Sequence, residues 1–260
     1  VDESKGDVFI ILGGHAYLDE SFVRLNIEVL ENDASIGCSG GQIMNIYENT
    51  VGEIISKAMA SPFGVGNVTF RIGGKPGFVD TVAFGMYRKE VDEEIGGFDE
   101  TLVRNQDDEY NFKLTKAGYK VYFDPEIISH YYVRGSYKKL YKQYYQYGYW
   151  KVYVNRMHKT ITTVRQLFPL IFVLGIIVGA ALSILFPLFS IVFGVGILAY
   201  LLLALYFGTK GSKKPIKIIK IALIYPVLHW SYGYGYLKGL IHFFLLKRDP
   251  AEKHKTMSRD

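Results

Sequence analysis

The longest uncharged stretch of the chain restricts its fold more than any other feature. Residues 167–207 contain no Asp, Glu, Lys or Arg and are mostly apolar. Because a helix needs ~20 apolar residues to cross a bilayer core, this stretch fits two crossings and is too long for one. Phe186 and Pro187 lie near its middle, and a proline there ends one helix and begins the next. The stretch predicts a transmembrane hairpin; two buried helices of a soluble core are the alternative.

The charges on either side of this stretch predict its orientation. The net charge of +5 comes from the C-terminal part, because no acidic residue lies between Glu126 and Asp249. Basic residues flank the stretch within 134–165 and within 210–220, which places both flanks in the cytoplasm. We therefore expect a multi-pass protein of the plasma membrane. Its basic residues alternate with apolar segments, which favours lipid headgroups as partners over nucleic acid.

Residues 221–246 form a third apolar segment that contains Lys238 and two histidines. A third crossing would put the basic residues from Lys247 outside, against the positive-inside rule. We therefore expect a re-entrant or interfacial helix here. Residues 209–260 are then a basic loop, this membrane-associated segment and a cytosolic tail.

Residues 1–133 alternate short strand and helix patterns, which predicts an α/β domain. The single Cys38 excludes an internal disulfide framework. A turn is expected at Gly13 and Gly14, and Asp19 is expected to cap the first helix. The expected strands are 7–12, 36–38, 42–46, 78–85 and 119–123, the expected helices are 19–31 and 107–117, and 96–99 is expected as a loop.

Residues 136–158 are rich in tyrosine, with Tyr137 and Tyr141 at helical spacing and three lysines close by. An aromatic and basic helix directly before a membrane segment is typical of the membrane interface. A helix packed on its own domain is the alternative, and the two are compatible. We treat 134–165 as one interface region.

The densest group of polar residues is 104–109, which leads into a predicted helix. Carboxylates at a helix start interact favourably with the macrodipole, which explains Asp107, Asp108 and Glu109 without any function. Alternatively, one of them accepts a proton from an acceptor hydroxyl.

The sequence NQDDEYNFKL at 105–114 resembles the Glu-Asp motif of family-2 glycosyltransferases, in which a helix-opening Asp precedes an Arg-Leu pair. Lys113 stands at the Arg position, and six residues before it stands Asp107. The resemblance implies that Asp107 is the catalytic base and that Glu109 stands where relatives often carry a second acid. Gln106 replaces the usual Glu, and Lys113 replaces the usual Arg.

Other motifs narrow the resemblance and extend it over nearly the whole chain. SPFGVG at 61–66, VDTV at 79–82 and GGFDE at 96–100 look like the succinoglycan branch of exopolysaccharide transferases. QYYQYGYW at 143–150 is similar to the Gln-x-x-Arg-Trp element of polysaccharide synthases, although it lacks the Arg. The residues that this resemblance implies for substrate or acceptor binding are Asp80, Thr81, Arg104, Asp108, Glu109, Arg134, Gln143, Tyr147 and Trp150.

The resemblance also implies a fold and a domain order. Residues 1–133 would be the C-terminal half of a GT-A (Rossmann-like) domain without its nucleotide-binding N-terminal half. The transmembrane hairpin would occupy 166–208.

The family also implies a divalent metal, Mg²⁺ or Mn²⁺, on the sugar diphosphate. LGGHA at 12–16 lies where the branch shows Asp-x-His-Ala, so His15 is the candidate ligand. Gly13 replaces the Asp, and Mg²⁺ is held mainly by carboxylates and phosphates. A single imidazole is a poor substitute for that carboxylate.

The function implied is inverting transfer of a sugar from a nucleotide sugar to a lipid-linked or polysaccharide acceptor. Asp107 would take the acceptor proton, and the leaving diphosphate would need positive partners, for which Arg134 and the 143–150 helix are candidates. Arg134 as an interfacial anchor and Trp150 as a membrane-belt residue are the alternatives. The alternative function is a non-catalytic membrane scaffold of a glycan assembly complex.

Overall fold

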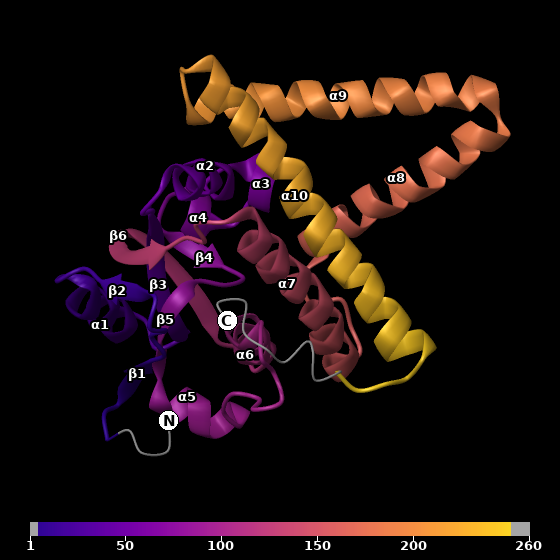
Figure 1. Ribbon diagram of the computed structural model, residues 1–260. Coiled ribbons are helices and arrows are strands. Elements are labelled where there is room, and N and C mark those ends of the chain that lie inside the picture. The colour runs from indigo at the N-terminus through magenta and orange to yellow at the C-terminus, as the bar shows by residue number, and fades with distance from the viewer. Residues whose placement is uncertain (1–4, 251–260) are drawn as a thin grey trace. The chain divides into compact units, whose positions relative to one another are not determined.

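The computed structural model describes residues 5–250 and divides them into two compact units (Figure 1). Unit 1 runs up to Ile46 and resumes over Asn67–Val133. Unit 2 consists of Tyr47–Gly66 and the chain from Arg134 onward. Unit 1 ends at 133, as the α/β region of the sequence does, but residues 47–66 inside that region belong to unit 2.

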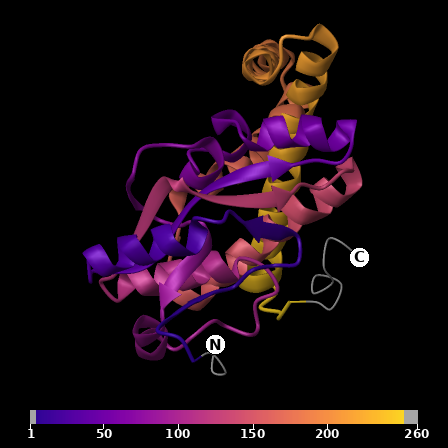
Figure 2. The ribbon, with the colours of Figure 1, turned by 90° about the vertical axis from the view of Figure 1, so that its left-hand side faces the viewer.

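Unit 1 is built on one mixed sheet with the strand order β1-β5-β3-β6-β2, and β4 pairs with β6 beside this path. The strands are β1 (Val8–Ile10), β2 (Ala16–Leu18), β3 (Ile36–Ile46), β4 (Gly77–Val79), β5 (Ala83–Arg88) and β6 (Lys120–Tyr132). The long strands β3 and β6 run parallel, and Figure 2 shows them side by side. Their register shifts between Gly41 and Gln42. Glycine is required at 41, because a Cβ there would lie 1.9 Å from the carbonyl oxygen of Ile127.

Helices cover this sheet through apolar side chains. They are α1 (Phe22–Asn32), α4 (Thr69–Ile72), α5 (Lys89–Ile95) and α6 (Gln106–Lys116). Helix α1 buries Phe22, Asn26 and Leu30, which share one face because they are four residues apart. Tyr110 and Leu114 of α6 join the main core, which has strand residues from β1, β3, β5 and β6. The predicted α/β class of this region is confirmed.

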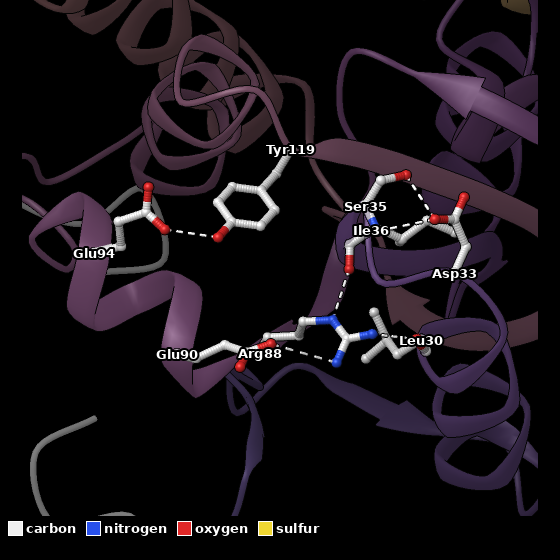
Figure 3. Close-up of polar contacts among 8 residues, drawn as sticks. All are labelled: Leu30, Asp33, Ser35, Ile36, Arg88, Glu90, Glu94 and Tyr119. Atoms are coloured by element: carbon white, nitrogen blue, oxygen red, sulfur yellow. Dashed lines mark hydrogen bonds and ion pairs between the residues drawn. The ribbon is translucent and has the colours of Figure 1, made fainter.

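A polar cluster fixes the end of α1 to the sheet (Figure 3). The Nε atom of Arg88 donates to the carbonyl oxygen of Ile36 at 2.9 Å, and its Nη2 atom donates to that of Leu30. Because the last carbonyls of a helix lack partners within the helix, Arg88 stabilises the C-terminus of α1. Nearby, the Tyr119 hydroxyl donates to Glu94 at 2.6 Å.

Several predicted boundaries in unit 1 are wrong in instructive ways. The strands expected at 36–38 and 42–46 are one strand, β3, because Ser39, Gly40 and Gly41 pair as strand residues. The strand expected at 78–85 is two, β4 and β5. The strand expected at 119–123 continues as β6 to Tyr132. Asp19 accepts from the backbone and hydroxyl of Ser21, so it caps the turn before α1 and not the helix itself.

Unit 2 is helical. Its helices are α2 (Thr50–Met59), α3 (Pro62–Val65), α7 (Tyr137–His158), α8 (Phe168–Leu185), α9 (Pro187–Gly211) and α10 (Pro215–Leu240), with a 3₁₀ turn at Val164–Leu167 and a π-helical turn at Ile241–Leu245. Within the described residues, Val164–Leu185 and Pro187–Gly211 are long and apolar enough to cross a membrane. Their side chains are largely exposed, for example Ile184 at 83 % and Leu188 at 78 %. The predicted break at Phe186 and Pro187 is confirmed (Figure 1).

Helices α7 and α10 meet backbone to backbone at glycines. A Cβ on Gly148 would lie 2.0 Å from the carbonyl oxygen of Tyr232, and one on Gly235 would lie 2.1 Å from that of Tyr145. Small residues permit this approach. The third apolar segment is formed by most of α10, which starts at Pro215 and runs through Pro226 to Leu240, and by the π-helical turn Ile241–Leu245. Its position relative to a membrane stays a prediction.

Residues 47–66 dock α2 and α3 onto α10 within unit 2. The Nζ atom of Lys217 donates to both carboxylate oxygens of Glu53, at 2.6 and 2.7 Å. Further along α10, Nε2 of His229 lies 2.7 Å from the carbonyl oxygen of Phe63. These bonds join an early segment of the chain to one of its last helices.

Candidate functional site

Asp107 lies exposed in the first turn of α6. The helix follows Asn105, whose backbone is left-handed with φ 63°, a conformation that asparagine adopts more readily than most residues. The backbone N–H of Asp108 donates to Oδ1 of Asp107 at 3.0 Å. Burial raises the pKa of the Cys38 thiol and of the Tyr87 phenol, and the charge of Asp107 adds to both shifts. The exposed carboxylate of Asp107 thus disfavours the charged forms of these two buried groups.

Glu109 lies in the interior, two residues further along the same helix. Only 1 % of its surface is exposed, and its Oε2 atom is 3.8 Å from Nζ of Lys113. Lys113 also donates to the carbonyl oxygen of Gly97. The lysine at the position of the family arginine thus joins α6 to the GGFDE loop, and Glu109 holds that lysine.

Asn111 connects α6 to the loop that carries Asp80 and Thr81. Its Nδ2 atom donates to Oγ1 of Thr81 at 2.9 Å, and the asparagine is fully buried. Among the residues that the structure describes, no hydrogen-bond partner lies within reach of its Oδ1 atom. Asn111 follows Asp107 by one helical turn, so both lie on one side of α6. This spacing was the signal that could have identified Asn111 from sequence.

Among the other predicted residues of unit 1, Arg104 lies just before α6, Asp108 lies in its first turn, and Asp80 and Thr81 lie in the loop that Asn111 contacts. Asp80 is exposed, and Thr81, Arg104 and Asp108 are partly buried. The GGFDE loop supports α6 through stacking of Phe98 on Tyr110, with ring centroids 4.0 Å apart. Tyr110 donates to Asp92 at 2.7 Å. The first turn of α6 is therefore held by a packed loop.

His15 packs against Tyr131 in another part of unit 1. The ring centroids are 5.1 Å apart with an edge-to-face angle of 77°. The guanidinium carbon of Arg71, on α4, lies 5.6 Å from the centroid of the same Tyr131 ring. Arg71 had no signal in the sequence, because it is a lone arginine in a short segment and its partner ring is distant in the chain.

The residues present do not fit a protein-held divalent metal. In residues 5–250, no three His, Cys, Asp or Glu side chains come together as a possible metal site. A Cβ at Gly13 would lie 3.2 Å from Nδ1 of His15, so an aspartate at this position would place its carboxylate next to the imidazole. Glycine has no carboxylate to offer a metal ion.

The other predicted residues belong to unit 2 and are buried, except for Tyr147, which is partly buried. Arg134 is 5 %, Gln143 1 % and Trp150 0 % exposed. The Nε2 atom of Gln143 donates to the hydroxyl of Tyr147 at 2.8 Å. The alternative of Trp150 as a membrane-belt residue is wrong, because no part of its surface is exposed. Only the start of α7, with Tyr137 and Tyr141 exposed, keeps the character expected of an interface helix.

Two curated proteins resemble the chain over most of its length. One, from Methanococcus voltae, is named dolichyl N-acetyl-alpha-D-glucosaminyl phosphate 3-beta-D-2,3-diacetamido-2,3-dideoxy-beta-D-glucuronosyltransferase. It is 34 % identical over 251 residues, which cover 93 % of this chain and 73 % of the relative. The other is the succinoglycan biosynthesis protein ExoA of Rhizobium meliloti, 26 % identical over 238 residues, covering 91 % of this chain and 71 % of the relative. No protein-family model matches the chain.

Proposed function

The chain belongs to the glycosyltransferases, and from this premise we propose that it moves a sugar from a nucleotide sugar to a lipid-linked acceptor with Asp107 as the base. The observation that carries the proposal is the exposed Asp107 carboxylate in the first turn of a helix anchored by Asn111 and Lys113. The mixed sheet of unit 1 supports its assignment to part of a GT-A domain.

The reaction is a single displacement. Asp107 accepts the proton of an acceptor hydroxyl while that oxygen forms a bond to the anomeric carbon of the donor. The bond from this carbon to the diphosphate oxygen breaks, and its electron pair leaves with the nucleoside diphosphate. Attack opposite the leaving group inverts the anomeric configuration. The diphosphate gathers negative charge and needs positive partners.

The three neighbouring carboxylates differ in how well they suit the role of base. Glu109 is buried and lies next to Lys113, so an acceptor hydroxyl does not reach it in this arrangement. Asp108 is partly buried, whereas Asp107 is exposed. Exposure favours Asp107 because a base has to come within hydrogen-bond reach of the proton that it removes.

A lipid-linked acceptor agrees with unit 2. Most apolar side chains of α8 and α9 are exposed, with Leu170, Val173 and Ala204 among the exceptions, and this exposure suits a hairpin surrounded by lipid. The name of the Methanococcus voltae relative specifies a dolichyl sugar phosphate as its acceptor. Lysines on both sides of the hairpin support a plasma-membrane location with the catalytic part facing the cytoplasm.

Substitution of the base tests the proposal. Asp107→Asn should lower sugar transfer by about 10²–10⁴-fold, because the amide cannot accept the proton. The measurement is mass spectrometry of lipid-linked products in membranes supplied with a panel of nucleotide sugars. Glu28→Gln, an equally small change at an exposed position of α1, should transfer like the wild type.

Transfer at the wild-type rate by Asp107→Asn would assign the base to another residue. Membership of the family goes against the scaffold alternative. That alternative would regain support if the wild-type chain, inserted in membranes, transferred none of the sugars.

A further inference from the structure

Unit 1 contains a cation that the proposed reaction has not used. Arg71 lies on α4, which packs on β3 and β6, and glycines with left-handed backbones, Gly66 at φ 72° and Gly73 at φ 82°, flank this segment. The guanidinium carbon lies 5.6 Å from the ring centroids of both Phe70 and Tyr131. These aromatic contacts hold the cation in one place.

No anion neutralises Arg71 within the part of the chain that the structure describes. Its Nη1 atom is buried there and has no hydrogen-bond acceptor, while the residue as a whole keeps part of its surface exposed. A buried donor without an acceptor is costly. A ligand oxygen that reached this nitrogen would remove that cost.

The surroundings of Arg71 connect it to the base. His15 packs on the same Tyr131 ring as Arg71. On that ring also lies Phe84, at 6.5 Å between centroids. Phe84 has a left-handed backbone with φ 52°, a strained conformation that persists most often at functional sites. It follows Thr81 by three residues, and Thr81 is bonded to Asn111 on the helix of Asp107.

We propose that Arg71, which shares the Tyr131 ring with His15, binds the diphosphate of the sugar donor. Its guanidinium supplies the positive charge that a metal ion would supply if the residues around Gly13 formed a metal site. This inference rests on the proposed function. A guanidinium presents a planar fork of donors that matches two phosphate oxygens at once. Placed at the departing oxygen, it stabilises the charge that develops as the sugar–phosphate bond breaks.

The test measures binding of inorganic pyrophosphate to the full chain in nanodiscs of neutral lipid, by calorimetry in the presence of EDTA. The wild type should bind at millimolar concentration or below. Arg71→Gln should raise the Kd about 10- to 100-fold, as loss of a charge-assisted pair implies. Arg71→Lys should fall between the two, because an ammonium keeps the charge and loses the fork. Arg24→Gln, which removes an exposed arginine of α1, should match the wild type.

Three results would overturn the proposal: equal pyrophosphate affinity of Arg71→Gln and wild type, no wild-type binding at millimolar pyrophosphate, or wild-type binding that requires Mg²⁺. If Arg71→Gln does not fold, as judged by its thermal unfolding, Arg71→Lys carries the test, and equal affinity to wild type again overturns it.

A second arm separates the donor from a lipid phosphate. Sedimentation with vesicles containing phosphatidic acid should be the same for Arg71→Gln and wild type. Weaker vesicle binding with unchanged pyrophosphate binding would assign Arg71 to lipid phosphate and contradict the donor site. Asp107→Asn should bind pyrophosphate like the wild type, so a failure of the base assignment stays distinguishable from a failure of this site.

Discussion

At the scale of single residues, the sequence identifies site residues that lie close together in one helix. It does not identify residues that come together only when distant parts of the chain pack side by side. Asp107 is a candidate base because of its position in the local motif at 105–114, and in the structure it is exposed in the first turn of α6. Arg71 depends on Tyr131, which is distant in the chain and adjacent only after folding. Glu109 and Trp150 have the residue types expected of ligand contacts, yet both are interior. Burial of this kind depends on which helix face meets the core, and a polar stretch does not reveal that.

Asn111 gives a prediction at this scale. Asn111→Ala removes the bond to Thr81 and leaves a small cavity, so we expect the free energy of unfolding to fall by about 1–3 kcal/mol. We also expect slower transfer, because the loop of Asp80 and Thr81 loses its anchor on α6. Urea unfolding and the transfer assay measure the two effects. Asn32→Ala, at the exposed end of α1, should change neither, and unchanged stability of Asn111→Ala would show that the bond has no structural weight.

At the scale of elements, the lack of charge and the position of Pro187 predict the two long apolar helices α8 and α9 correctly, whereas several strand limits differ from the prediction. An uncharged stretch with one proline near its middle leaves few alternatives to the pair α8 and α9. Strand limits are different, because β3 continues through Gly40 and Gly41 only by pairing with β5 and β6. Glycines within a strand pattern look like a break when the partner strands are unknown.

The glycine contacts between α7 and α10 give the prediction for this scale. Gly235→Ala would place a Cβ 2.1 Å from the carbonyl oxygen of Tyr145, so the helices must separate. We expect a loss of about 1–3 kcal/mol in stability. Gly194→Ala in α9, where a Cβ meets nothing within 4 Å, should be neutral or slightly stabilising. Thermal unfolding of the purified variants in detergent compares them, and equal unfolding temperatures would contradict the close packing.

At the scale of the whole molecule, the order of the α/β region and the long apolar helices is predictable from the sequence, and the two relatives confirm that the chain belongs to the glycosyltransferases. That residues 47–66 belong to unit 2 is not predictable from the sequence. Helix α2 is amphipathic, and its sequence resembles that of a surface helix of an α/β domain. The local sequence does not show that the apolar side of α2 packs on α10. The chain therefore passes between the units at Ile46, at Gly66 and at Val133.

The ion pair of Glu53 and Lys217 predicts how acid affects unit 2. The hydrogen bonds from Lys217 lower the pKa of Glu53. A carboxyl group with a lower pKa in the folded state stabilises that state above its unfolded pKa, near 4.5, and this contribution disappears as the pH falls through the folded value. When the unfolding temperature is measured from neutral pH downward, it should fall more steeply below about pH 4.5 for the wild type than for Glu53→Gln. Glu48→Gln, an exposed change in the same segment, should follow the wild type, and parallel curves for all three proteins would refute the coupling.

The docking of α2 and α3 on α10 also has a consequence for the order of events during synthesis. Glu53 and Lys217 are 164 residues apart in the chain, and at ribosomal speeds of about 5–20 residues per second α10 emerges on the order of ten seconds or more after α2. During that interval the apolar side of α2, with Ile54, Ile55 and Met59, lacks α10, on which it packs in the folded protein. Unit 1 can fold once the chain up to Val133 has been made, whereas unit 2 cannot be completed until translation has almost ended. A ribosome that stalls before α10 would therefore leave a nascent chain in which unit 1 is folded and the apolar side of α2 is exposed. Chaperones bind intermediates of this kind.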